Sequence, residues 1–127
     1  MKKKVLLINA PTIRIRTVGN DNYFPIGLLY LATVLKNNGI DTKILDVNNL
    51  FYLKEVNEST LRGYLDGDFS GYLKDYHPDI VGIGCTFSGA FKSLKMIAGK
   101  IKEILPAIPI AIGGIHPTIF AKEILEK

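Results

Sequence analysis

The stretch "DIVGIGCTFSGAFKSLKMIAGKIKEILPAIPIAIGG", residues 79–114, decides the fold. It opens with a short apolar run at 79–85 and closes with another at 108–114. Between them, at 88–105, apolar residues recur at helical spacing. Short runs rich in Val, Ile and Gly predict strands buried on both faces, and the middle pattern predicts an amphipathic helix. A strand, a helix and a strand in this order predict a right-handed unit whose two strands are parallel.

The rest of the chain repeats this alternation. Further strands are predicted at 4–9 and 41–47, and further helices at 25–39 and 118–127. The segment 48–78 is longer than an ordinary connection, but its apolar residues fall on one side of a helical pattern that Gly67 interrupts or kinks. These apolar residues are Leu61, Leu65, Phe69, Tyr72, Leu73 and Tyr76.

Strands that alternate with helices predict an α/β fold, a parallel sheet with helices on both faces. The expected architecture is a flavodoxin-like (Rossmann-like) three-layer sandwich with strand order 2-1-3-4, lacking the usual fifth strand. The fourth strand would then be an open edge, which proteins normally protect. We therefore expect residues 1–127 to be one domain of a longer protein, or the open edge to be capped by another chain, for example in a homodimer.

Composition excludes several broad classes. The 127 residues are enough for one domain with a real core, and 47% apolar with 22% charged residues is an ordinary globular balance. No apolar run approaches the roughly 20 residues that span a bilayer, and the apolar stretch after the amino-terminal lysines is too short for a signal peptide. The net charge of +4 is mild, and its lysines are not interleaved with aromatic residues. We expect a cytoplasmic protein that binds neither membrane nor nucleic acid.

Cys85 is the single cysteine. It excludes an internal disulfide and any site that needs several cysteines, such as an iron–sulfur cluster or a multi-cysteine zinc site.

A ligand is expected beyond the carboxyl ends of the parallel strands, where the strand order reverses. In this sequence that rim comprises 9–12, 46–48, 85–89 and 113–118. The segment between the first predicted strand and the helix at 25 is long for a connection, and such loops commonly bind something. Thr86 and Ser88 add hydroxyl groups next to a helix amino terminus, which favours a polar or anionic oxygen group.

Several familiar site motifs are absent. The sequence has no Walker loop, no G-x-G-x-x-G fingerprint, no G-x-S-x-G elbow, and none of the acidic residues of a phosphate-accepting receiver domain. A flavin mononucleotide site would need a loop rich in Ser and Thr after the first strand, and only Thr12 and Thr17 are available there. A flavin-binding domain remains an alternative on this weaker ground.

Four segments together resemble a known family: "KVLLINAP", "FPIGLLYLATVLKNNGIDTKILD", "PDIVGIGCTFS" and "IPIAIGGIHPT". In order and spacing they are similar to the amino-terminal cobalamin-binding domain of cobalamin-dependent radical S-adenosylmethionine (SAM) enzymes. That group includes methyltransferases and enzymes of the anaerobic magnesium-protoporphyrin monomethyl ester cyclase type. The resemblance covers nearly the whole chain.

The resemblance implies where cobalamin would lie. The corrin ring would cover the strand ends and face a second domain, while the nucleotide tail would extend into the rim. Gly113 and Gly114 would let the tail pass close to the backbone, since a side chain there would occupy the space. The implied cofactor-binding residues are Ala10, Pro11, Thr12, Arg14, Thr86, Phe87, Ser88, Gly113, Gly114, Ile115, His116 and Pro117.

Two motifs of cobalamin and radical enzymes are missing. The D-x-H-x-x-G motif, whose histidine ligates cobalt from below, is absent, since His116 follows a glycine pair and His77 precedes a strand at the opposite rim. The resembled family commonly does without this ligand. The C-x-x-x-C-x-x-C motif is also absent, so a [4Fe-4S] cluster and S-adenosylmethionine would belong to a carboxyl-terminal radical SAM domain of the parent enzyme. We expect no catalysis from this domain alone, and a cofactor-free regulatory or interaction domain is the other alternative.

Overall fold

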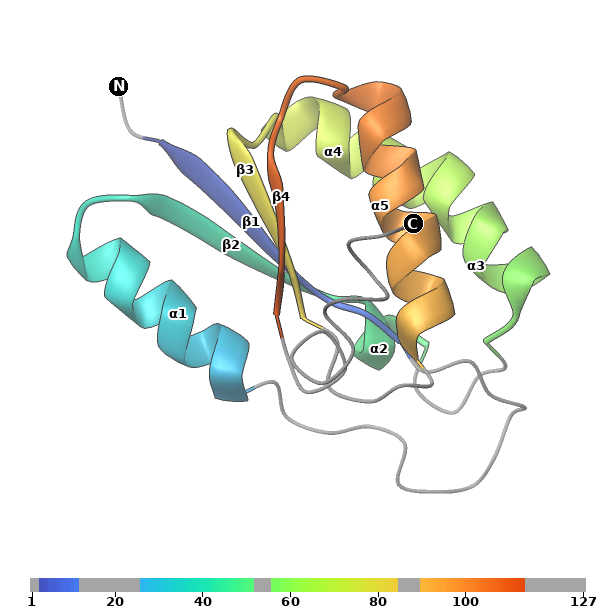
Figure 1. Ribbon diagram of the computed structural model, residues 1–127, viewed down its shortest axis with the longest axis horizontal. Coiled ribbons are helices and arrows are strands. Elements are labelled where there is room, and N and C mark those ends of the chain that lie inside the picture. The colour runs from blue at the N-terminus through green and yellow to red at the C-terminus, as the bar shows by residue number, and fades with distance from the viewer. Residues whose placement is uncertain (1–2, 12–25, 52–55, 85–89, 114–127) are drawn as a thin grey trace.

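Four parallel strands form one sheet in the order β2-β1-β3-β4 (Figure 1). The computed structural model describes residues 3–11, 26–51, 56–84 and 90–113. The strands are β1 Lys4–Asn9, β2 Asp41–Asp46, β3 Ile80–Gly84 and β4 Ile110–Gly113. The predicted fold class and strand order are confirmed.

Helices cover the two faces of this sheet unequally. Helix α1 (Ile26–Asn37) packs on one face, against β1 and β2. The other face carries α3 (Glu58–Tyr64), α4 (Ser70–Tyr76) and α5 (Phe91–Ile104). The short helix α2 (Val47–Leu50) follows β2 at the carboxyl ends of the strands (Figure 1).

The main core lies between the sheet and the helices α3 to α5. Helix α5 contributes one stripe of buried residues, Leu94, Ile97 and Ile101, because these positions recur at helical spacing. Alternate residues of β1, Leu6 and Ile8, face the same core and have no exposed surface. Val5 and Leu7 face α1, so this strand is buried on both sides, as its continuous apolar run predicts.

The long connection between β2 and β3 is helical almost throughout. Helix α3 starts with a capping box, in which the Asn57 side chain accepts from the Thr60 amide at 2.9 Å and the Asn57 amide donates to Thr60 Oγ1 at 3.0 Å. The predicted interruption at Gly67 is a π-helical turn, η1 (Leu65–Phe69). The helix therefore continues through Gly67 instead of breaking, because the extra residue is absorbed in the wider turn.

In the described ranges, β1 has its predicted ends, and the other elements differ from the predicted ends by at most three residues. Helix α1 ends before Gly39, whose φ of +78° suits the turn that closes the helix, and the Ile40 amide then donates to the Leu35 carbonyl at 3.0 Å. Residue Val47 belongs to α2 and not to the second strand. The predicted helix at 118–127 lies outside the described residues. Within the described ranges, no helix is long and apolar enough to cross a membrane.

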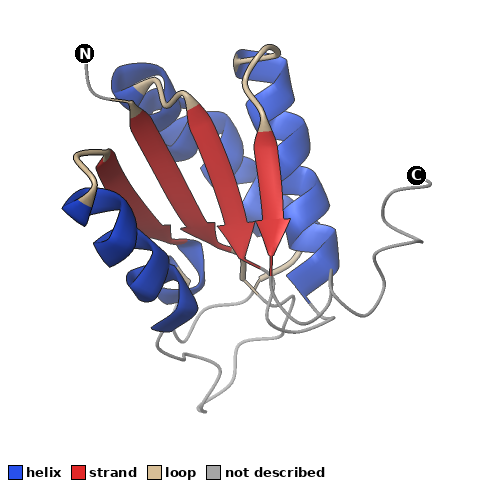
Figure 2. Ribbon diagram, turned by 60° about the vertical axis from the view of Figure 1, so that its left-hand side comes forward, coloured by secondary structure: helices blue, strands red, loops and turns tan. Residues whose placement is uncertain are grey.

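On the α1 face of the sheet, the described helices leave the area over β3 and β4 bare. Figure 2 shows α1 in front of one side of the sheet, with none of the described helices before β3 and β4. Ile80 is 41% exposed, and Ala111 and Gly113 are exposed as well. On the flank of α1 away from β2, Leu31 and Val34 each keep 53% of their surface exposed. This bare area borders the carboxyl rim at Gly113.

Candidate functional site

The last residues of the four strands form one row across the sheet. Asn9 is in register with Asp46 on one side and with Gly84 on the other, and Gly84 is in register with Gly113. Neighbouring strands lie about 4.8 Å apart, so the row spans roughly 14 Å from Asp46 to Gly113. Paired residues point to the same face, and here that is the face of α1. The rim predicted from the sequence is thus a continuous line of four residues.

Half of this row is polar and fixed by hydrogen bonds. The Asn9 amide nitrogen Nδ2 donates to Asp46 Oδ1 at 2.9 Å. The same carboxylate oxygen accepts from the Asn49 backbone amide at 3.1 Å and so caps α2. Asn9 is only 2% exposed, and Asn48 of α2 is fully buried. A buried amide in the central strand is tolerated because it is paired, and the pairing sets the orientation of the Asp46 carboxylate.

The other half of the row has no side chains. A Cβ added at Gly113 would meet no heavy atom of the described residues within 4 Å. A Cβ added at Gly84 would lie 3.4 Å from Leu28 Cδ2, so α1 approaches β3 closely at this end of the sheet. Gly113 therefore offers bare main chain that faces open space, with the apolar side chain of Leu28 near the next residue of the row.

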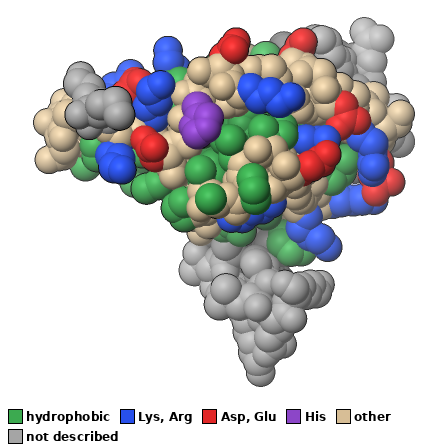
Figure 3. All heavy atoms as spheres, turned by 90° about the horizontal axis from the view of Figure 1, so that it is seen from above, with side chains coloured by type: hydrophobic (Ala, Val, Ile, Leu, Met, Phe, Trp, Pro, Cys, Tyr) green, Lys and Arg blue, Asp and Glu red, His purple; other side chains and the backbone are tan. Residues whose placement is uncertain are grey.

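The amino ends of the strands carry a different surface. Figure 3 looks onto this end, where basic, acidic and histidine side chains surround an apolar patch. His77 is here, since it ends α4 with a left-handed φ of 49° and stands three residues before β3. His77 is therefore separated from the rim by the whole length of β3, at about 3.3 Å per residue. His77 cannot reach a group bound at the row of strand ends, as the sequence predicted.

Three of the twelve predicted site residues lie in the described ranges. Ala10 and Pro11 are buried directly after β1, with the Ala10 amide donating to the Gly84 carbonyl at 3.1 Å. The Ala10 side chain belongs to the core on the α5 side. Gly113 ends β4 on the rim. The other nine predicted residues lie outside the described ranges: Thr12, Arg14, Thr86, Phe87, Ser88, Gly114, Ile115, His116 and Pro117.

Asn9, Asp46 and Gly84 complete the row. Asn9 and Asp46 lay in the rim predicted from the sequence but were not among the twelve site residues, and Gly84 was in neither set. The signal that could have found Gly84 is its place as the last residue of an apolar strand. In the described part of the chain, no group of three or more His, Cys, Asp or Glu side chains could hold a metal ion.

A family profile described as "B12 binding domain" matches residues 11–127. The chain belongs to the B12-binding domain family. The cofactor of this domain is cobalamin, and the resemblance seen in the sequence is confirmed at the level of the family.

One curated relative of the B12-binding domain is an enzyme. The cytidylyl-2-hydroxyethylphosphonate methyltransferase of Streptomyces wedmorensis is 33% identical over 129 residues, which cover 98% of this chain. The chain spans about a quarter of that enzyme's length (24%). The similarity therefore concerns one part of a much longer protein.

The described residues fit cobalamin in their chemistry. The extended nucleotide tail of cobalamin can lie close to the main chain only where no side chain is in the way. An added Cβ at Gly113 meets no described heavy atom within 4 Å, so this residue meets the requirement. The corrin ring carries amide side chains, and the Asn9–Asp46 pair supplies fixed polar atoms on the same row.

Proposed function

We propose that this chain is the cobalamin-binding part of a larger methyltransferase of the radical SAM type. The observation that carries the proposal is the row Asp46, Asn9, Gly84 and Gly113, in which two bare residues adjoin two fixed polar ones in a B12-binding domain. The name of the methyltransferase relative supports one-carbon transfer as the activity of the parent protein.

Gly113 would hold the nucleotide tail of cobalamin by letting it lie against the main chain, since a side chain there would occupy that space. Leu28 packs over Gly84 and would bound the tail from the side of α1. Asp46 would accept hydrogen bonds from corrin amide groups, since its Oδ1 is fixed by Asn9 and by the start of α2. When bound, cobalamin supplies methyl-transfer chemistry at its cobalt atom.

We further propose that no histidine of this chain ligates the cobalt from below. The support from the described residues is the position of His77, at the far end of β3 from the rim. The remaining histidine, His116, lies outside the described residues, and the resemblance to radical SAM enzymes argues against a ligand there.

The radical chemistry would come from a different part of the parent protein. A [4Fe-4S] cluster needs several cysteines and this chain has only Cys85. The length of the relative, of which this chain matches 24%, leaves ample room for a second domain. That domain would bind the cluster and S-adenosylmethionine, and would face the corrin ring.

Cofactor binding is tested by mixing the purified chain with hydroxocobalamin, removing free pigment by gel filtration and recording the visible spectrum. Retained corrin absorption at one equivalent supports the proposal, and flavin mononucleotide in a parallel sample serves as the competing cofactor. Failure to retain any corrin at concentrations well above the micromolar range would refute it.

The ligand below cobalt is tested on the reduced, paramagnetic cob(II)alamin form by electron paramagnetic resonance. A spectrum without splitting from an axial nitrogen is expected for wild type and for His77→Ala and His116→Ala alike. Nitrogen splitting that disappears in His116→Ala would overturn the statement about the lower ligand while leaving cobalamin binding intact.

A further inference from the structure

The Asp46 carboxylate has one oxygen held by the protein and one that is open to a ligand. Its Oδ1 accepts from the Asn9 side chain at 2.9 Å and from the Asn49 backbone amide at 3.1 Å. None of the described residues donates to the other oxygen, Oδ2. Among the described side chains, Ser93 Oγ is the only buried polar atom without a hydrogen bond, so Oδ2 of the partly exposed Asp46 is accessible. The carboxylate is therefore fixed and presents a free acceptor at the rim.

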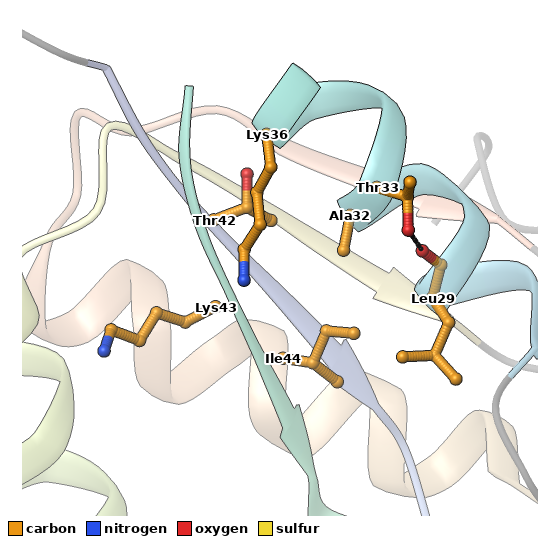
Figure 4. Close-up of a pocket in the computed structure, with 7 residues that line it drawn as sticks. All are labelled: Leu29, Ala32, Thr33, Lys36, Thr42, Lys43 and Ile44. Atoms are coloured by element: carbon orange, nitrogen blue, oxygen red, sulfur yellow. Dashed lines mark hydrogen bonds between the residues drawn. The ribbon is translucent and has the colours of Figure 1, made fainter. Parts of the chain in front are cut away.

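No described cation pairs with this carboxylate. The Lys and Arg side chains of the described residues form no ion pair with Asp46. Lys43 lies on the opposite face of β2, because side chains alternate along a strand and it stands three positions before Asp46. Lys36 of α1 lines a hollow of about 330 Å³ beside Thr42 and Ile44, nearer the amino end of β2 (Figure 4). The charge on Asp46 is thus not neutralised by a described side chain.

The rest of the row of strand ends adds no charge. Asn9 is an amide that donates to Asp46, and Gly84 and Gly113 have no side chains. Asp46, at the β2 end, is the one charged residue of the four. A fixed carboxylate in this setting accepts from N–H donors and repels other carboxylates.

Cobalamin and its hydrolysed forms differ in this property. The corrin ring carries primary amides around its edge, each with two N–H donors and no charge. Hydrolysis of one amide replaces the donors with a carboxylate, which at neutral pH only accepts hydrogen bonds. A fixed carboxylate on the protein therefore distinguishes the two forms of a corrin side chain that reaches it, although they are almost equal in size.

We propose that Asp46 makes the site selective for corrinoids with an amide next to it and rejects those with a carboxylate at that position. Oδ2 accepts from one corrin amide, while Asn9 and the start of α2 hold it in a fixed direction. This inference rests on the proposed function, since it requires cobalamin at the row of strand ends. The selected feature is the charge of the corrin edge.

The test compares the affinity of the 127-residue chain for hydroxocobalamin and for its b-, d- and e-monocarboxylic acids, each with one hydrolysed propionamide. The N-methylamides of the same side chains serve as neutral controls. Affinities are measured at neutral pH by titration of the visible spectrum. We expect at least one acid to bind roughly 5- to 100-fold more weakly than hydroxocobalamin, because it loses a charge-assisted hydrogen bond and brings a like charge to Asp46. Its N-methylamide should bind within about threefold of hydroxocobalamin, since it keeps one N–H donor and adds no charge.

Variants assign the selectivity to one residue. Asp46→Asn removes the charge and keeps the cap of α2, because Asn and Asp are equally good N-cap residues. It should bring the affinity for the weak acid to within about threefold of that for hydroxocobalamin. Asp75→Asn is the matched control, since it removes the same charge from an exposed position on α4 and should leave the difference unchanged.

Each outcome decides a separate point. Affinities for hydroxocobalamin and all the acids that agree within about twofold would overturn the selectivity and leave cobalamin binding intact. A difference that persists in Asp46→Asn would overturn the role of Asp46. Absence of hydroxocobalamin binding would contradict the proposed function and this inference together. If Asp46→Asn fails to fold, the wild-type comparison of acids with their N-methylamides, and the reduction of that difference at high salt, decide the question.

Discussion

Replacing Gly113 by valine should separate cobalamin binding from folding. Gly113 ends β4 in an exposed position, and an added Cβ meets no described heavy atom within 4 Å. Its φ lies outside the left-handed range, so the backbone accepts an L side chain without strain. The substitution therefore adds three carbons to the space above the main chain and disturbs nothing beneath it.

The two expected effects have opposite signs. Glycine inside a strand costs about 0.5–1 kcal/mol relative to alanine, and valine is favoured in strands, so the free energy of unfolding should stay level or rise by up to about 1 kcal/mol. Forcing extra carbons into an occupied space costs about 1–3 kcal/mol. If the nucleotide tail crosses Gly113, the dissociation constant for hydroxocobalamin should therefore rise roughly 5- to 150-fold.

Affinity is measured by titration of the visible spectrum, and stability by urea unfolding of the chain without cofactor. Gly99→Val is the matched control, because Gly99 is exposed on α5 and an added Cβ there also meets nothing within 4 Å. It should leave the affinity unchanged. Wild-type affinity in Gly113→Val would mean that the tail does not pass over this residue. A loss of stability above about 1 kcal/mol would instead show that the space is already filled.

Three further substitutions test the scaffold, each by urea unfolding. Gly39→Ala should cost about 1–2 kcal/mol, because φ is +78° at this position, and an unchanged midpoint would contradict the turn that ends α1. Asn57→Ala removes the capping box of α3 and should cost about 0.5–2 kcal/mol, whereas the exposed Ser59→Ala next to it should be nearly neutral. Burial, with Asp41 nearby, raises the pKa of Tyr76 to about 12. The unfolded chain thus loses this proton first, stability should fall as the pH rises from 10 to 12, and Tyr76→Phe should make that fall shallower; an equal fall in both proteins would refute the shift.

The parallel sheet was predictable because the strands are short continuous apolar runs, which are typical of strands buried on both faces. A run such as "KVLLIN" has no polar alternation, so it must be covered on both faces, and the helical stripes before and after it supply the covers. Of the six apolar residues predicted on one side of a helical pattern at 48–78, four are buried in the core, namely Leu61, Leu65, Phe69 and Leu73. Tyr72 and Tyr76 are partly buried against it. The predicted interruption at Gly67 is a π turn, a geometry that the spacing of apolar residues did not specify.

The candidate site was predictable in place but not in detail. The rule that ligands bind beyond the carboxyl ends of parallel strands located the rim and Gly113. It did not reveal that Asn9 donates to Asp46, since these residues are 37 positions apart and meet only through the register of β1 with β2. It did not reveal either that Gly84 and Gly113 are neighbours.

The sequence by itself determined the order of elements, the parallel direction of the strands and the end of the sheet where a ligand is expected. Those properties follow from local periodicity and from the fixed hand of crossover connections. Only the tertiary structure decided which polar side chains pair on the rim, and that none of the described helices covers β3 and β4 on the α1 side. These properties depend on register and on the packing of distant segments, which no stretch of sequence contains on its own.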